Sequence, residues 1–258
     1  MVEHSIRIVL LVFAFVFGTV IFSFLNVVIY RLPRKENFIT GRSKCPVCSH
    51  VLSFLDMVPI LSWVVLGRKC RYCGSRISAR YAWIEALGGL SAVACAGMFG
   101  FRVYTVLAFA MCAVLTCVGV IDHDTMEIPD GLSLAAAIIG GVAVFFTTGV
   151  PWYEHLIGLF VISVPMLVIA LLIPGGFGGG DIKLMAGCGL FLGWKNALFS
   201  FFAAAVIGGI YALVLILRKK RGRKDRIPFG PFLCMGVAAA MFVGDIVLDF
   251  YVGVLLGF

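Results

Sequence analysis

The chain has 258 residues, of which 62% are hydrophobic and only 13% are charged. This balance excludes a soluble domain, because soluble domains carry about twice that share of charged side chains. The sequence therefore predicts an all-α polytopic membrane protein. The formal net charge is +8, but basic clusters beside apolar runs are typical of the cytoplasmic face of membrane proteins and require no nucleic-acid partner.

Apolar runs predict about eight transmembrane helices, because a helix needs about 20 mainly apolar residues to cross the hydrocarbon core. The runs are residues 8–30, 83–101, 103–121, 131–149, 156–173, 182–194, 197–217 and 231–256. The sixth run is short, so it must borrow flanking residues, thin the bilayer locally or lie inside the helix bundle. The first run is too long for a signal-peptide core and is expected to be a retained helix.

The distribution of Lys and Arg predicts the orientation of these spans. With residues 31–80 in the cytoplasm and eight alternating spans, only Arg7, Arg102 and Lys195 of the 21 Lys and Arg lie outside cytoplasmic segments. Both termini then lie outside. We divide the chain into a first transmembrane helix (residues 1–30), a cytoplasmic loop (31–81) and a transmembrane core (82–258).

Two acids stand at cytoplasmic ends of apolar runs. Asp122 follows the third run, and Asp181 follows the glycines at 178–180 and precedes the sixth run. An ionised carboxylate at membrane depth costs roughly 2.5–3.5 kcal/mol on insertion scales, so such acids are candidates for function. Two carboxylates that share a proton can activate water for peptide hydrolysis. From spacing alone, a proton- or ion-coupled transport site fits these acids as well, and helix capping or cation binding also remains open.

Further polar residues have structural interpretations. Asp130 follows the turn signal Ile128-Pro129 and is expected to cap the helix over residues 131–149. Asn26 and Glu85, in the first two apolar runs, are expected to pack or to form interhelical hydrogen bonds.

Four cysteines in the predicted cytoplasmic loop have the spacing C-x2-C-x21-C-x2-C, formed by Cys45, Cys48, Cys70 and Cys73. This pattern predicts a tetrahedral zinc site, and a cytoplasmic location disfavours disulfides. Four thiolates leave no position for a catalytic water, so the zinc is expected to be structural. Redox chemistry or a metal-free loop are the alternatives. The remaining cysteines lie in apolar runs and are expected to be buried thiols: Cys95, Cys112, Cys117, Cys188 and Cys234.

Several motifs together resemble a known family. Asp122-x7-Asp130 with Pro129, followed by Gly178-Gly179-Gly180-Asp181-Ile182-Lys183-Leu184, resembles the bacterial type IV prepilin peptidases. These are leader peptidase/N-methyltransferases, a GxGD-type aspartic membrane protease family. The segments at 23–33 and 227–233 resemble the early and late signatures of that family. The match runs in order from about residue 18 to 236, and many members carry the same cysteine loop.

The resemblance implies that Asp122 and Asp181 are the catalytic aspartates, with the active site facing the cytoplasm from the bacterial inner membrane. It places the other motif residues in substrate and active-site loops: Gly178, Gly179, Gly180, Lys183, Pro129 and Asp130. The implied substrates are prepilins or pseudopilins of pili or type II secretion. Their basic leader is cut off after a Gly, and the new N-terminal residue is methylated by S-adenosylmethionine. No soluble-type cofactor loop is visible, so the S-adenosylmethionine-binding residues and the oligomeric state stay open.

Two other functions fit the same residues. A proton-coupled transporter would use Asp122 and Asp181 as proton carriers, although transporters often show internal repeats and none is clear here. A non-enzymatic assembly factor would use the cysteine loop as a docking module. The ordered motifs favour the peptidase over both alternatives.

Overall fold

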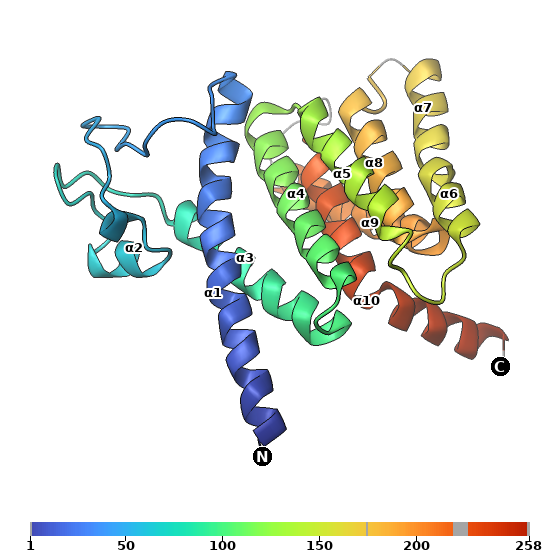
Figure 1. Cartoon of the computed structure of the whole chain (residues 1–258). Helices are drawn as coiled ribbons and strands as arrows, with labels where there is room; N and C mark the ends of the chain where they lie inside the picture. The colour runs from blue at the N-terminus through green and yellow to red at the C-terminus, as the bar shows by residue number, and fades with distance from the viewer. Residues whose placement is uncertain (1, 174, 219–226, 257–258) are drawn as a thin grey trace. The chain divides into compact units, whose positions relative to one another are not determined.

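The computed structural model describes residues 2–173, 175–218 and 227–256, and within these ranges the regular structure is helical apart from two isolated bridge pairs. The predicted all-α class is therefore confirmed (Figure 1). The chain divides into two compact units, residues 1–109 and 110–258. Most of the basic cluster predicted at 218–226 lies outside the described residues, as does Pro174 at the start of the glycine loop.

The described helices are α1 (Val2–Arg31), η1 (Leu32–Arg34), η2 (Phe54–Met57), α2 (Leu61–Val65), α3 (Ala79–Phe99), α4 (Val103–Thr125), α5 (Asp130–Ala143), α6 (Trp152–Val161), α7 (Ser163–Leu172), α8 (Gly179–Leu192), α9 (Trp194–Leu217) and α10 (Gly230–Leu256). Each of the eight predicted apolar runs is helical over most of its length. Six described segments are long and apolar enough to cross a membrane. The protein is thus a multi-pass membrane protein.

The other two runs form shorter helices than a full span requires. α5 and α8 have 14 residues each, which corresponds to a length of about 21 Å against a hydrocarbon core of about 30 Å. α5 ends at Ala143 instead of continuing to residue 149, so that predicted end was wrong. The physical reason lies in the residues that follow, because two threonines, Gly149 with a φ of 87° and Pro151 disfavour helix continuation.

In the first unit, α1 packs against α3 along glycine-lined surfaces. A Cβ atom added to Gly18 would lie 2.3 Å from the Gly88 carbonyl oxygen, so the two backbones approach closely only because both residues lack side chains. Ser23 of α1 donates a hydrogen bond to Glu85 of α3 at 2.7 Å. Asn26 donates to a backbone carbonyl of α3 at 3.3 Å. The interhelical hydrogen bonds expected for Asn26 and Glu85 are therefore confirmed.

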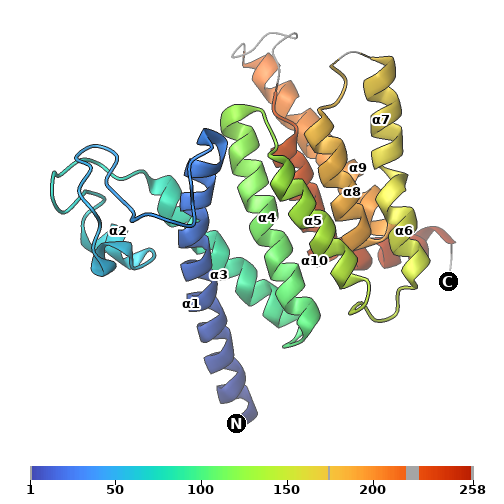
Figure 2. The same ribbon diagram turned by 45° about the horizontal axis from the view of Figure 1, so that its top comes forward.

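In the second unit, α8 is the central helix and packs against α5, α6, α7, α9 and α10. Figures 1 and 2 both show α8 beside α5 and α6. The close approach depends on glycines, since a Cβ added to Gly158 of α6 would lie 2.2 Å from the carbonyl oxygen of Gly189 in α8. Of the three possibilities for the short sixth run, the structure favours the one in which it lies inside the bundle. Gly193, with a φ of 76°, separates it from α9.

Candidate active site and metal centre

Asp122 lies in the last turn of α4 and is buried, with 6% of its surface exposed. Its Oδ2 accepts a hydrogen bond from the backbone N–H of Gly230 at 3.0 Å. Gly230 begins α10, so the carboxylate also faces the positive end of a helix dipole. A Cβ added to Gly230 would lie 2.6 Å from that same oxygen. Only glycine at this position allows the observed approach.

Asp181 lies in the first turn of α8, where its side chain reaches back to the residue that precedes the helix. Its Oδ2 accepts a hydrogen bond from the backbone N–H of Gly178 at 3.3 Å. Its Oδ1 is buried and has no hydrogen-bond partner. Such an oxygen is costly in a folded protein, and it commonly marks a place where a ligand, a proton or a water acts.

The glycines before Asp181 have different surroundings. A Cβ added to Gly180 would lie 2.8 Å from Cβ of Ile128, in the loop that follows Asp122. A Cβ added to Gly179 would have no neighbouring atom within 4 Å. Gly180 is therefore the residue whose missing side chain allows the start of α8 to pack directly on the 126–129 loop.

Lys183 and Asp130 form a second link between the same segments. Lys183 Nζ donates to Asp130 Oδ1 at 2.7 Å, and both side chains are more than half exposed. Asp130 is the first residue of α5, and Pro129 occupies the N-cap position without a side-chain cap. The expectation that Asp130 caps this helix was wrong, because its carboxylate pairs with Lys183 instead.

The structure brings together the two acids that topology had placed on one membrane face. Asp122 and Asp181 lie near enough for the charge of one carboxylate to affect the other. The buried thiol of Cys234 in α10 lies near both acids. Sequence reasoning had not assigned Gly230, Ile128 or Cys234 to this site. Gly230, the glycine of the 227–233 motif, was the one sequence signal that could have pointed to this site.

Three aromatic rings lie beside the two glycines whose N–H groups donate hydrogen bonds to Asp122 and Asp181. Phe177, Phe201 and Phe229 lie with ring centroids 5.9–6.3 Å apart. Phe177 directly precedes Gly178, and Phe229 directly precedes Gly230. Aromatic pairs at such distances stabilise by about 0.5–1.5 kcal/mol beyond their buried area. This cluster therefore holds the two N–H donors, and with them the two carboxylates, in a common arrangement.

The four loop cysteines form the one group of metal-ligand type found among the described residues. All four Sγ atoms lie within 4.8 Å of one another, and Cys45 and Cys73 are 3.9 Å apart. A tetrahedral zinc site with Zn–S bonds of about 2.3 Å requires Sγ atoms about 3.8 Å apart. The cluster therefore fits a four-thiolate metal site. The five other cysteines are buried thiols, as expected.

Each cysteine pair lies in a tight turn closed by backbone hydrogen bonds, from Ser49 N to Cys45 O and from Gly74 N to Cys70 O, both 2.9 Å. N–H groups of Cys48 and Val47 lower the pKa of Cys45 to about 6. Although the His50 N–H acts in the opposite direction, burial and the neighbouring thiols raise the pKa of Cys48 to about 11. A cation is thus needed to ionise all four thiols together at neutral pH.

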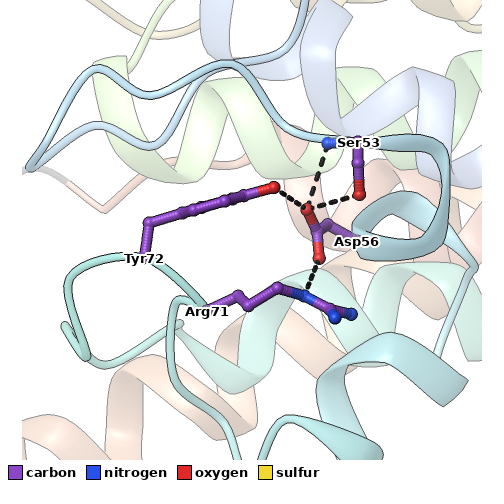
Figure 3. A network of polar contacts seen from close by, with 4 residues as sticks. All are labelled: Ser53, Asp56, Arg71 and Tyr72. Atoms are coloured by element: carbon purple, nitrogen blue, oxygen red, sulfur yellow. Dashed lines mark hydrogen bonds and ion pairs between the residues drawn. The ribbon is translucent and has the colours of Figure 1, made fainter.

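A buried acid ties the second cysteine turn to η2 (Figure 3). Asp56 accepts hydrogen bonds from the Ser53 N–H and hydroxyl, from the Tyr72 hydroxyl and from Arg71 Nε, at 2.7–3.0 Å. Its side chain is only 2% exposed. Burial acts to raise the pKa of Asp56, but the hydrogen bonds from Ser53, Arg71 and Tyr72 outweigh it and lower the pKa to about 2.

Comparisons with known proteins match the same two parts of the chain. A family model described as Bacterial Peptidase A24 N-terminal domain matches residues 16–99. A second, described as Type IV leader peptidase family, matches residues 109–213. These matches lie largely within the first and second compact units, respectively.

Three similar relatives are each named prepilin leader peptidase/N-methyltransferase. The one from Burkholderia pseudomallei (strain 1026b) is 34% identical, over 91% of this chain and 85% of its own length. The one from Bacillus subtilis (strain 168) is 32% identical, over 94% and 98%. The one from Aeromonas salmonicida (strain A449) is 32% identical, over 94% of each. No solved structure matches the chain.

Proposed function

Because the chain belongs to the type IV leader peptidase family, we propose that it is an endopeptidase of the bacterial inner membrane that removes the leader from prepilin-like proteins. We further propose that it methylates the new N-terminal residue. The observation that supports the peptidase activity best is the pair of neighbouring carboxylates, each of which accepts one backbone N–H at the start of a helix.

The geometry supports a division of labour between carboxylate oxygens. Oδ2 of each acid accepts a hydrogen bond from a glycine N–H, which sets its orientation. Oδ1 of Asp181 has no donor, so it is available to a water or to a proton. In the proposed reaction one acid takes a proton from water as it attacks the scissile carbonyl, and the other protonates the departing amine. The pair titrates as a unit, so we assign the two roles to the pair.

The test is a processing assay with Asp122→Asn and Asp181→Asn as separate variants. Each should reduce cleavage of a prepilin-type peptide by at least about 1,000-fold, because each removes one proton-transfer group. Asp249→Asn is the control, since it changes an exposed acid of α10 that lies 19 residues after Gly230, and it should retain most activity. Full cleavage by either correctly folded catalytic variant would contradict the paired mechanism.

The methyltransferase activity would use S-adenosylmethionine as methyl donor. Its support is the name shared by the relatives, and no cofactor-binding residue is assigned. A peptide that already begins at the cleaved N-terminus separates this step from proteolysis. Transfer of a labelled methyl group to that peptide is expected even in Asp181→Asn. If the peptide carries no more label than in protein-free controls, the methyltransferase proposal is wrong and only the peptidase activity remains.

We propose that the cysteine cluster holds one structural zinc ion through Cys45, Cys48, Cys70 and Cys73. Its support is the fit of the Sγ spacing to tetrahedral coordination. Elemental analysis of the purified protein should give one zinc per chain, and Cys73→Ser should lose most of it. Cys95→Ser, which alters a buried thiol in α3, is the control and should keep the zinc. Equal zinc content in both variants would contradict the assignment.

The orientation completes the proposal. The bias of Lys and Arg supports a cytoplasmic position for residues 31–80 and for the two acids, with both termini outside. Substrate proteins would then meet the site from the cytoplasmic edge of the bilayer. Membership in a peptidase family weighs against the two alternative functions. The transporter explains the two acids but not the cysteines, and the assembly factor explains the cysteines but not the acids.

A further inference from the structure

The cysteine loop carries an apolar segment that its own fold leaves uncovered. Residues 54–65 include η2 and α2, and their large apolar side chains are strongly exposed: Phe54 82%, Leu55 65%, Leu61 63%, Val64 59% and Val65 80%. Large exposed apolar side chains gathered in one segment commonly mark an interaction site. The question is which partner covers it.

The position of this segment beside α1 indicates the partner. The backbone N–H of Ile60, directly before α2, donates to Glu85 Oε2 at 2.8 Å. The other oxygen of Glu85 accepts from Ser23 of α1 at 2.7 Å. Ser23 precedes Arg31, the end of α1, by eight residues, or about 12 Å along the helix. α2 therefore lies beside a transmembrane helix pair, below the charged end of α1, as Figures 1 and 2 both show.

The only charged side chain of residues 54–65 is buried. Asp56 is the only charged residue between positions 54 and 65. Its carboxylate is enclosed by Ser53, Tyr72 and the cation of Arg71 (Figure 3). The outward side of residues 54–65 therefore presents apolar side chains without a free charge. Such a surface can enter lipid, whereas an exposed carboxylate would prevent it.

Cations follow directly after α2. A hollow of about 440 Å³ is lined by Trp63, Arg68, Lys69 and Arg76, among other residues. The guanidinium of Arg68 stacks over the Trp63 ring at 4.7 Å. Residues 31–80 contain ten Lys and Arg but two acids, so the loop remains cationic even with a zinc tetrathiolate of charge −2. Tryptophan and cations beside an apolar segment are typical of the zone where lipid headgroups lie.

We propose that residues 54–65 insert into the headgroup zone of the bilayer and that the hollow bounded by Arg68, Lys69 and Arg76 binds the phosphate of an anionic lipid. Three observations favour lipid over a protein partner: the depth set by Glu85, the enclosed charge of Asp56 and the adjoining cations. The surface thus docks the cysteine loop on the membrane. This inference does not depend on the peptidase proposal.

The test uses the full-length protein in vesicles, with a photoreactive amino acid placed at Val65 or, as a control, at Ile39. The two side chains are equally exposed, at 80% and 79%. Ile39 belongs to residues 37–42, whose carbonyls accept hydrogen bonds from Arg31 at the end of α1, so it lies outside the predicted insertion. Mass spectrometry should find about tenfold more phospholipid adduct at position 65 than at position 39, the ratio expected for insertion of one valine-sized side chain.

Lipid composition tests the headgroup site. In vesicles that mix phosphatidylcholine with phosphatidylglycerol, the adduct at position 65 should be enriched in phosphatidylglycerol. The double variant K69Q/R76Q should lose this enrichment, roughly fivefold per cation near the surface, while the apolar insertion persists. Equal adducts at positions 39 and 65, or adducts at position 65 with protein instead of lipid, would overturn the insertion. An adduct without preference for the anionic lipid would overturn the phosphate site.

Discussion

Asp56 in the cysteine loop and Asp181 at the start of α8 are both partly buried acids in apolar segments, but their hydrogen bonds differ. Asp56 accepts four hydrogen bonds at 2.7–3.0 Å, one of them from a guanidinium. Asp181 accepts one N–H at 3.3 Å, and its second oxygen has no donor. A carboxylate whose oxygens are fully engaged stabilises a fold. A carboxylate with one oxygen that accepts no hydrogen bond can still bind a water or a proton through that oxygen.

The same contrast separates the two regions that carry these acids. The loop is held by side chains and by four thiols that converge within a short stretch of chain. The acid site is held by backbone N–H groups at helix starts and by glycines that allow close approach. Apart from the two proposed catalytic aspartates, substitutions should therefore affect activity most at the glycines of the second unit and least in the loop.

After the two proposed catalytic aspartates, the largest effect is expected for Gly230→Ala. The added Cβ would lie 2.6 Å from Asp122 Oδ2, so the carboxylate must move away from the N–H that orients it. Displacement of a catalytic group by about 1 Å can cost about 100-fold in rate, and we expect at least that loss in the peptide cleavage assay. Gly209→Ala in α9 is the control, because its Cβ meets no atom within 4 Å. Similar rates in the two variants would show that Gly230 does not position Asp122.

A smaller effect is expected for Gly180→Ala, compared with Gly179→Ala beside it. The first adds a Cβ 2.8 Å from Ile128, whereas the second adds one in open space. Overpacking of this kind costs about 1–3 kcal/mol, so Gly180→Ala should slow cleavage by about tenfold or more while Gly179→Ala stays close to the unaltered protein. If Gly179→Ala were the more harmful variant, the proposed packing of α8 on the 126–129 loop would be incorrect.

The smallest effect on activity is expected for Asp56→Asn. The loss of the carboxylate should make residues 31–80 roughly threefold more sensitive to limited proteolysis, with little change in peptide cleavage. The pKa of Asp56 lies at about 2, below the usual value near 3.9, so its contribution is complete above about pH 4 and is lost only as the pH falls toward 2. The difference from the unaltered protein should therefore stay constant between about pH 5 and 8.

Glu36→Gln is the matched control for that experiment, because Glu36 is the other acid of the loop and is exposed. It should leave the proteolysis rate unchanged. A stronger effect of Asp56→Asn on peptide cleavage than on loop proteolysis would show that Asp56 serves activity and not the fold of the loop.

Much of the architecture was predictable from composition and periodicity. Lipid requires apolar helices of a certain length, so the apolar runs predicted the helices and their order, and six of them are long enough to span. The cysteine spacing predicted a cluster that the structure confirms as fit for a metal. The asymmetry of Lys and Arg predicted that Asp122 and Asp181 lie on one membrane face; the structure places the two acids near each other, and the face stays a prediction. The predicted orientation and the domain boundaries at 30 and 81 stay predictions.

Other features depended on contacts between distant segments. The hydrogen bond from Gly230 to Asp122 joins residues 108 positions apart, and no local pattern encodes it. The same holds for Ile128 against Gly180, for the ring cluster of Phe177, Phe201 and Phe229, and for Lys183, which draws Asp130 away from a capping role.

The sequence by itself determined that this is a helical membrane protein with a four-thiol cluster, because lipid and metal impose chemistry that can be read residue by residue. Only the tertiary structure decided that both carboxylate oxygens of Asp56 accept hydrogen bonds, whereas Oδ1 of Asp181 accepts none. That outcome depends on which donors the folded chain brings to each carboxylate. Arg71 and Tyr72 reach Asp56 from another turn of the loop, whereas Asp181 receives only the nearby Gly178 N–H.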